Sequence, residues 1–362
     1  MELPPALRRA VDRALEAIPL AELQRASETL SERYRAERCD GRAHLADDMA
    51  VRAYLATRLP ATYAAIRAAL AAVAEVRQDF APVSMLDAGA GPGTAAWAAA
   101  ECWPGLADAL LIEQSAPVRA WGERLMAEAP VPVARWRTDD LLGGLPGLEP
   151  RDLVVLGYVL DELPAEGRDR LIDRLWALTG TMLVIVEPGT PSGWQRLLAA
   201  RERLLAAGAC IVAPCPHAGS CPVALPDWCH FSRRVARSAL HRRAKQAELS
   251  WEDEKYVYLA VSRHQAKLPR ARVLARPRAG RGRITLKLCR HDGIVLERQW
   301  TRRDGEIYKA ARRLDWGAAL PTGVADDTYR LRPDSDMNLS QSGEESSPAR
   351  ERSNPSPPRD GV

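Results

Sequence analysis

A glycine-rich loop is the part of this sequence whose residue types and spacing most directly predict chemistry. Asp87 is followed by Gly89, Gly91 and Gly93 in the run Asp-Ala-Gly-Ala-Gly-Pro-Gly. Glycine lets a backbone approach a ligand closely, and a helix that begins after such a loop points N–H groups and the positive end of its dipole at the ligand. Residues 83–87 are typical of a buried strand and those after the loop of a helix, so we predict a nucleotide-like ligand here.

Two kinds of pocket use a loop of this type. Residues 91–96 fit the G-x-G-x-x-A register of dinucleotide-binding folds. An acid two positions before the first glycine instead resembles the first motif of the class I methyltransferases, in which the acid lies beneath the methionine part of S-adenosylmethionine. We favour S-adenosylmethionine as the cofactor, with Asp87, Gly89, Gly91 and Gly93 among its binding residues.

Acidic residues after the next two predicted strands extend this pocket. Glu113 ends the run 110–113, and its two carboxylate oxygens can accept hydrogen bonds from both hydroxyls of a ribose. NAD enzymes place an acid similarly, so Glu113 indicates a nucleoside without choosing between the two cofactors. Asp139 and Asp140 resemble the position that contacts the adenine amine in such folds, and a helix cap is the alternative explanation for the pair.

The segment after the fourth predicted strand, residues 156–164, is where an acceptor-side motif would stand. It has neither the Asn-Pro-Pro-aromatic motif of exocyclic-amine methyltransferases nor a Pro-Cys nucleophile. Tyr158, Asp161 and Glu162 lie in it, but sheet packing and helix initiation explain them equally well. The catalytic residues therefore stay unknown.

A cysteine-rich segment, residues 208–232, predicts a metal centre. Cys215, Cys221 and Cys229 are separated by five and seven residues among prolines. These gaps exceed those of zinc knuckles, and Cys-Pro steps recur beside iron–sulfur ligands, so a cluster is favoured over zinc. The candidates for a fourth ligand are Cys210, His217, His230 and Cys289.

Alternating strands and helices must position these residues. Short apolar runs separated by helical stretches from residue 83 onward predict a parallel sheet covered on both faces, an α/β fold. An Asp292-Gly293 turn between two β-type runs predicts a hairpin. The predicted units are an N-terminal helical cap (1–80), a methyltransferase-like domain (81–265) with a cysteine-rich insertion (208–232), a basic β-rich extension (266–325) and a disordered tail (333–362).

The charge distribution indicates a polyanionic partner. Residues 263–313 contain sixteen Lys and Arg against four Asp and Glu, although the whole chain carries a formal charge of only +4. We find neither an apolar run of about 18 residues nor a secretory signal at the start, which predicts a cytoplasmic protein without a membrane span. We expect a monomer.

With both constellations in view, the chain resembles the bacterial branch of a ribosomal small-subunit methyltransferase-like family, whose mitochondrial members include methyltransferase-like protein seventeen. The likeness covers roughly residues 40–320. It is carried by Arg58-Leu-Pro-Ala-Thr-Tyr63, Asp87 to Thr94, Glu187-Pro-Gly-Thr-Pro191, Ala213-Pro-Cys-Pro-His217, Cys221-Pro, Trp228-Cys-His-Phe231 and the run 254–263.

The resemblance implies a class I S-adenosylmethionine-dependent methyltransferase (Rossmann-like) fold and a [4Fe-4S] cluster held by four cysteines. Cys289 fits the last ligand, after Cys215, Cys221 and Cys229. The resemblance also implies binding to the small ribosomal subunit and its rRNA during assembly or translation, with the cluster structural. The alternative is an active S-adenosylmethionine-dependent rRNA methyltransferase.

Overall fold

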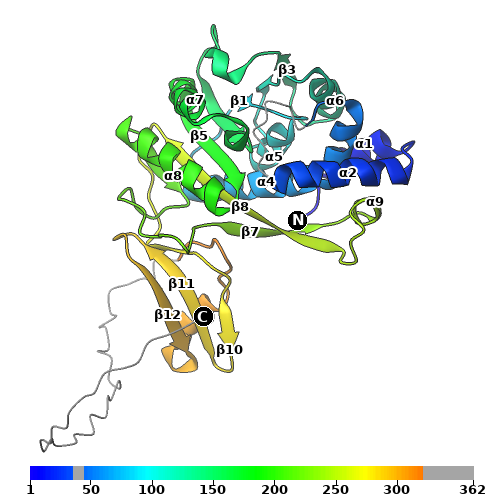
Figure 1. The fold of residues 1–362 in the computed structure, drawn as a ribbon. Helices are drawn as coiled ribbons and strands as arrows, with labels where there is room; N and C mark the ends of the chain where they lie inside the picture. The colour runs from blue at the N-terminus through cyan, green and yellow to red at the C-terminus, as the bar shows by residue number, and fades with distance from the viewer. Residues whose placement is uncertain (36–44, 321–362) are drawn as a thin grey trace, which may run out of the picture. The chain divides into compact units, whose positions relative to one another are not determined.

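The computed structural model describes residues 1–35 and 45–320, and the predicted disordered tail, 333–362, lies outside them. A sheet of eight strands organises most of the described chain (Figure 1). Its strand order is β3-β2-β1-β4-β5-β8-β6, and β7 pairs with the first half of β8. The strands are β1 (Ser84–Ala88), β2 (Asp108–Ile112), β3 (Val133–Arg137), β4 (Arg151–Gly157), β5 (Thr179–Pro188), β6 (Cys210–Ala213), β7 (Phe231–Ala236) and β8 (Trp251–Ser262).

Strand direction divides this sheet into two parts. Strands β1 to β5 are parallel to one another, whereas β8 runs antiparallel between β5 and β6. From the middle of the sheet, the chain proceeds outward through β1, β2 and β3 on one side and through β4 and β5 on the other. The direction of strand order therefore reverses between β1 and β4. In open α/β sheets, ligands bind outside the carboxyl ends of the strands at such a switch point.

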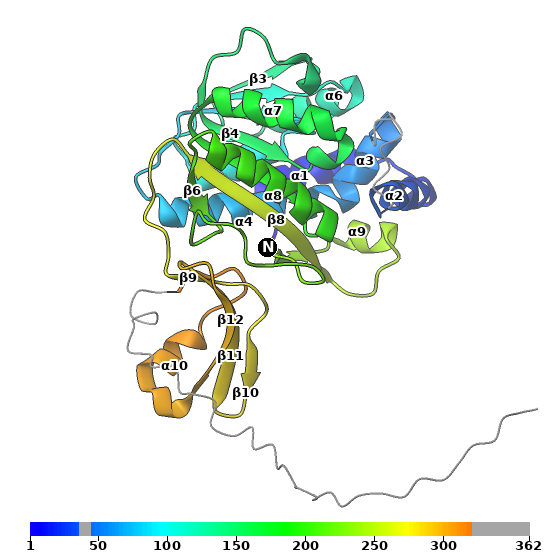
Figure 2. The same cartoon turned by 60° about the vertical axis from the view of Figure 1, so that its left-hand side comes forward.

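Helices cover both faces of the sheet, as the alternation in the sequence predicts (Figure 2). The buried neighbours Val154 and Val155 belong to two different cores, because successive strand residues point to opposite faces. One core includes residues of α3, α4, α5 and α6, and the other those of α7 and α8. The helices are α1 (Pro5–Leu15), α2 (Leu20–Arg35), α3 (Asp48–Thr57), α4 (Leu59–Val76), α5 (Thr94–Cys102), α6 (Ala116–Met126), α7 (Ala165–Ala177), α8 (Pro191–Ala206) and α9 (Ala239–Ala244).

Helix α4 corrects the expectation that the chain has no apolar stretch of about 18 residues. Its 18 residues have a mean hydropathy of 1.3, so its length and composition alone would suffice to cross a membrane. Within the protein 61% of this window is buried, and α4 contacts α5, β7 and β8. Packing in the core explains why α4 is apolar.

A second, smaller sheet follows β8 in the chain. Its strands are β9 (Ala271–Val273), β10 (Arg278–Gly280), β11 (Arg283–Arg290) and β12 (Val295–Thr301), and helix α10 (Gly305–Ala311) comes after them. The predicted hairpin is confirmed, because β11 and β12 pair antiparallel and Gly293 takes a positive φ of 78° in their turn. Ile284, Leu286 and Leu288 are buried on one face of β11.

Candidate functional site

A pocket lies at the switch point between β1 and β4, where the sheet topology places a ligand. It measures about 1000 Å³, open solvent at its mouth included. The residues predicted from the sequence that line it are Gly89, Gly91, Glu113, Asp139 and Asp140. Asp87 and Gly93 do not line the pocket directly, since Asp87 is buried at the end of β1 and Gly93 caps α5.

The glycine loop has the backbone conformation that the sequence predicts. Gly89, Gly91 and Gly93 have φ values of 69°, 54° and 85°, the left-handed region in which other residues are strained. A Cβ atom on Gly89 would lie 2.6 Å from Cγ2 of Val159, and one on Gly93 would lie 2.9 Å from Met126. Gly89 and Gly93 therefore have a steric as well as a conformational reason to be glycine.

Glu113 is tied to this loop by hydrogen bonds. The backbone N–H of Gly91 donates to Oε2 of Glu113 over 3.0 Å, and that of Ser115 donates to Oε1 over 2.8 Å. Burial raises the pKa of Glu113, and these two bonds oppose the shift. The carboxylate is thus held at the pocket wall at the end of β2.

Asp139 and Asp140 have different roles in the structure. Oδ1 of Asp140 accepts the N–H of Leu142 over 2.9 Å, so the helix-cap explanation is confirmed for this residue. Asp139 forms an ion pair with Arg137 over 2.7 Å. Both residues still line the pocket, and their contact with an adenine stays a prediction.

Asp87 is a buried carboxyl group beneath the loop. Its side chain is 2% exposed, and its Oδ2 atom has no hydrogen-bond partner among the residues described. Burial, and then the charge of Glu113, raise the pKa of Asp87 to about 7. The two carboxyl groups favour a positively charged ligand when both are ionised.

This raised pKa predicts that binding of a cationic ligand weakens in acid. Between pH 8 and pH 6 the ionised fraction of a carboxyl group with a pKa of about 7 falls roughly tenfold. We expect the affinity for S-adenosylmethionine, whose sulfonium and ammonium groups are positive, to fall by about the same factor. Isothermal titration calorimetry at both pH values measures it.

Asp87→Asn is the control, because an amide does not titrate in this range, so its weaker binding should be nearly independent of pH. The stability of the fold should depend on pH in the opposite direction from the affinity. Between pH 3.8 and about 7 the folded protein keeps a proton on Asp87 that the unfolded chain releases, so the free energy of unfolding should fall as the pH rises through this range. A wild-type affinity equal at pH 6 and pH 8 would contradict the assignment.

The wall of the pocket contributed by the N-terminal helices was not predicted as a site. Tyr34, Tyr54 and Arg58 line it, and Tyr158 faces it from the end of β4 with a φ of 59°. The guanidinium of Arg58 lies over the ring of Tyr34, 5.4 Å from its centroid. The segment Arg58-Leu-Pro-Ala-Thr-Tyr63 was the sequence feature that could have indicated this pocket wall.

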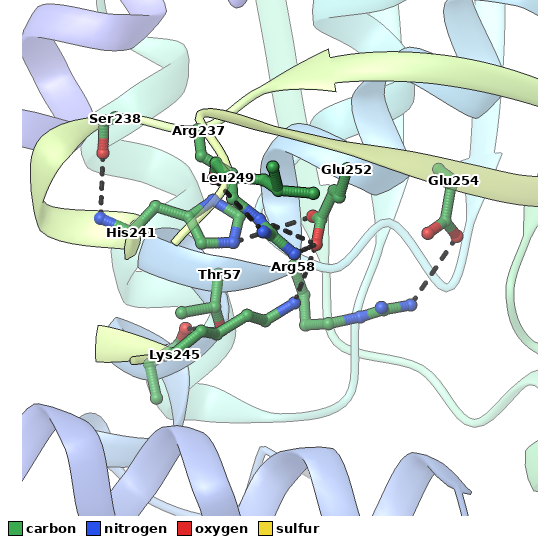
Figure 3. Close-up of polar contacts among 10 residues, drawn as sticks. Thr57, Arg58, Arg237, Ser238, His241, Lys245, Leu249, Glu252 and Glu254 are labelled. Carbon is green, nitrogen blue, oxygen red and sulfur yellow. Dashed lines mark hydrogen bonds and ion pairs between the residues drawn. The ribbon is translucent and has the colours of Figure 1, made fainter. Parts of the chain in front are cut away.

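Strand β8 holds Arg58 in place (Figure 3). Nη2 of Arg58 lies 3.7 Å from Oε1 of Glu254, and the hydroxyl of Tyr158 donates to the same oxygen over 3.1 Å. Two residues earlier on β8, Glu252 pairs with Arg237 and Lys245 over 2.9 and 3.3 Å. Glu254 thus ties the pocket wall to β8, and Glu252 ties β8 to the segment after β7 and to the end of α9.

The cysteines form the second constellation. Cys215, Cys221, Cys229 and Cys289 all line one cavity of about 340 Å³, open solvent included. Cys210 is not among its lining residues, because it lies on β6 and pairs with Ser262. The structure thus brings together the three loop cysteines and Cys289 of β11.

The two histidine candidates differ in position. His217 lines the cavity, with its Nε2 3.5 Å from Sγ of Cys289. The ring of His230 instead stacks on Trp228 and meets Trp316 edge to face. Within the described chain, His217 is therefore the histidine next to the thiols.

The thiols are held away from water and close to one another. Burial, followed by the neighbouring thiols Cys215 and Cys221, raises the pKa of Cys289 to about 12. Burial and the same neighbours also raise the pKa of Cys229. Within residues 1–35 and 45–320, no three His, Cys, Asp or Glu side chains form a group suited to one metal ion, so the metal centre stays a prediction.

The strand order, the antiparallel β8 and the glycine loop at the switch point define the fold of a class I S-adenosylmethionine-dependent methyltransferase. A family model described as "Mitochondrial small ribosomal subunit Rsm22" matches residues 48–321. The chain belongs to this Rsm22 family.

One relative and two solved structures illustrate the likeness. The human "Ribosome assembly protein METTL17, mitochondrial" is 30% identical over an alignment of 297 positions that covers 74% of this chain and 62% of the human protein. Magnesium protoporphyrin IX methyltransferase (ChlM) from Synechocystis PCC 6803 is 15% identical with a TM-score of 0.37, covering 65% of this chain and 94% of that one. Precorrin-6y C5,15-methyltransferase from Geobacter metallireducens is 16% identical with a TM-score of 0.36, covering 54% and 86%. These two structural likenesses carry no conclusion about function.

Proposed function

We propose that this protein binds the rRNA of the small ribosomal subunit during assembly or translation, as a cytoplasmic monomer. The family and the human ribosome assembly relative support a role at the ribosome. One observation carries the proposal: Cys289, on a strand of the basic sheet, meets three cysteines of the 215–229 loop at one cavity. A centre at that place joins the basic sheet to the methyltransferase-like domain.

The proposed centre is a [4Fe-4S] cluster with Cys215, Cys221, Cys229 and Cys289 as ligands. The gaps of five and seven residues between the loop cysteines exceed those of zinc knuckles. All four thiols line one cavity, and Cys-Pro steps recur beside iron–sulfur ligands, which supports a cluster over zinc. Bound there, the cluster supplies iron–sulfur bonds that fix a Pro-rich loop with little core of its own.

We propose S-adenosylmethionine as the ligand of the pocket at the glycine loop. The loop backbone would approach the cofactor, Glu113 would accept the ribose hydroxyls, and Asp87 would supply negative charge near the methionine part. The fold and the shape of the loop support this assignment. Methyl transfer is not part of the proposal.

An exposed group of arginines on the smaller sheet is the proposed rRNA contact. Arg281 and Arg283 flank Gly282 in the β10–β11 turn, and Arg302 and Arg303 follow β12. The N–H of Arg302 donates to the carbonyl of Gly282 over 3.0 Å, which brings the two segments together. We call these four residues the arginine tip.

Not all basic residues of the segment 263–313 can contact RNA. Arg272 is 1% exposed. Arg263 lies over the ring of Trp176, 3.8 Å from its centroid, and donates to the carbonyl of Thr179. Arg272 is therefore not available to phosphates, and the guanidinium of Arg263 is held against Trp176, so the arginine tip carries the proposal.

Charge reversal at the arginine tip tests this proposal. The triple variant Arg281→Glu, Arg302→Glu and Arg303→Glu should bind a small-subunit rRNA fragment more weakly. The slope of log affinity against log salt should become shallower by about 2, since each lost phosphate contact removes about 0.7. Filter binding across a salt series measures both quantities.

The matched control reverses three exposed arginines on other helices, Arg9, Arg25 and Arg170. It changes the net charge of the protein by the same amount and should leave the slope close to that of the wild type. Equal loss of affinity and slope in both triple variants would show that overall charge, and not the arginine tip, governs binding.

A further inference from the structure

Arg272 is a buried cation at the cysteine cavity. It lies on β9, is 1% exposed, and lines the cavity together with the four thiols. Its Nε donates to the carbonyl of Pro214 over 2.8 Å and its Nη1 to that of Gly317 over 2.9 Å. Its Nη2 is buried and has no hydrogen-bond partner in the described part of the chain.

Arg201 approaches the same loop from α8. It is 3% exposed, and its Nη2 donates to the carbonyls of His217 and Gly219 over 3.1 and 2.7 Å. Its Nε is buried without a partner among the described residues. The two carbonyls lie between Cys215 and Cys221 in the chain, so Arg201 packs against the loop that carries both thiols.

The two arginines carry positive charge that the surrounding protein does not balance. Neither forms an ion pair with a carboxylate within residues 1–35 and 45–320. Burying a cation without a counter-charge is unfavourable, and neutral thiols offset little of this cost. Four thiolates around a [4Fe-4S] core with a charge of +2 carry a net charge of −2, which two arginines balance.

We propose that Arg201 and Arg272 are the counter-charges of the cysteine centre. The inference rests on the proposed cluster. Arg272 acts from the cavity wall and Arg201 from behind the loop, each through the charge of its guanidinium. They are positioning residues, which retain the centre and favour its reduced form, because reduction adds one further negative charge.

The test uses the full-length protein purified without oxygen, as wild type, Arg272→Met, Arg272→Lys and Arg201→Met. The control is Arg174→Met, which removes another arginine that donates to a backbone carbonyl, that of Leu145, outside the cavity. Each protein is titrated with dithionite, and the reduced cluster is followed by electron paramagnetic resonance. A second assay follows bleaching by a chelator.

The two methionine variants should each shift the ratio of reduced to oxidised cluster about tenfold toward the oxidised form at a fixed potential. For a one-electron couple this equals a midpoint potential lower by 59 mV. Bleaching should be about tenfold faster. Arg272→Lys keeps the charge and should restore a potential close to that of the wild type, and Arg174→Met should behave as the wild type does.

The outcomes separate this inference from the proposed cluster. If the wild-type protein contains no iron, the proposed cluster itself is wrong. If the wild type holds a cluster, and both methionine variants have its midpoint potential and its bleaching rate, the counter-charge role is wrong. If both methionine variants lose the cluster, iron retained in Arg272→Lys supports the role of charge, and iron lost there as well contradicts it.

Discussion

Replacing Cys289 by serine is expected to remove the proposed iron–sulfur cluster and to weaken the proposed rRNA binding by about tenfold or more. Wild-type protein purified without oxygen should be brown, with about four iron atoms per chain. The variant should be nearly colourless, because Cys289 is the proposed ligand on β11 and its side chain lines the cavity. Iron and sulfide analysis and binding to a small-subunit rRNA fragment measure the two effects.

The loss of RNA affinity follows from how the basic sheet is held. Among the described residues, the contacts that tie it to the cysteine loop include Arg272 to the Pro214 carbonyl over 2.8 Å and Trp316 to the His230 carbonyl over 2.9 Å. A neutral hydrogen bond contributes about 1 kcal/mol, and one from a charged group about 1.5–3 kcal/mol. The cluster would contribute far more, so its loss should also speed proteolysis after Arg263.

Cys210→Ser is the matched control for this prediction. Cys210 is half-buried like the loop cysteines, but it lies on β6 and does not line the cavity. Its replacement should leave the iron content and the RNA affinity unchanged. Loss of iron in Cys210→Ser with full iron in Cys289→Ser would show that the fourth ligand has been assigned to the wrong cysteine.

Gly89→Ala is the second large expected effect, a loss of S-adenosylmethionine affinity of at least about 100-fold. Gly89 has a φ of 69°, where a Cβ atom costs about 1–2 kcal/mol. The added carbon would also lie 2.6 Å from Cγ2 of Val159, so the loop and the pocket wall must separate. Isothermal titration calorimetry measures the loss.

Gly208 is the control that separates the effect of backbone strain from that of the clash with Val159. Gly208 has a φ of 82°, no atom lies within 4 Å of where its Cβ would be, and it is not a lining residue of the pocket. Gly208→Ala should lower the midpoint of thermal unfolding and keep the affinity. If both variants lose stability equally and bind as the wild type does, the loop at 89–93 is not the cofactor site.

The parts of the fold set by local pattern were predictable from the sequence. Apolar runs of strand length, the glycine loop and the Asp292-Gly293 turn determine their own local structure, and the structure confirms them. The structure also brings Cys215, Cys221, Cys229 and Cys289 to one cavity, and their role as cluster ligands stays a prediction.

Features that depend on packing between distant segments were not predictable. Nothing in the spacing of Tyr54 and Arg58 says that their helices reach the pocket at β1 and β4. Arg272 was counted as part of a basic surface, yet the cysteine loop buries it. Charge counting along a chain cannot distinguish a buried cation from an exposed one, because burial is decided by residues far away in sequence.

Crosslinking of the full-length protein to RNA in its own cells, followed by mapping of the crosslinked reads, tests the central claim most directly. We predict that reads map mainly to small-subunit rRNA and that the Arg281→Glu, Arg302→Glu and Arg303→Glu variant loses most of them. Reads that map mainly to mRNA or tRNA, or that are unchanged in the variant, would contradict it.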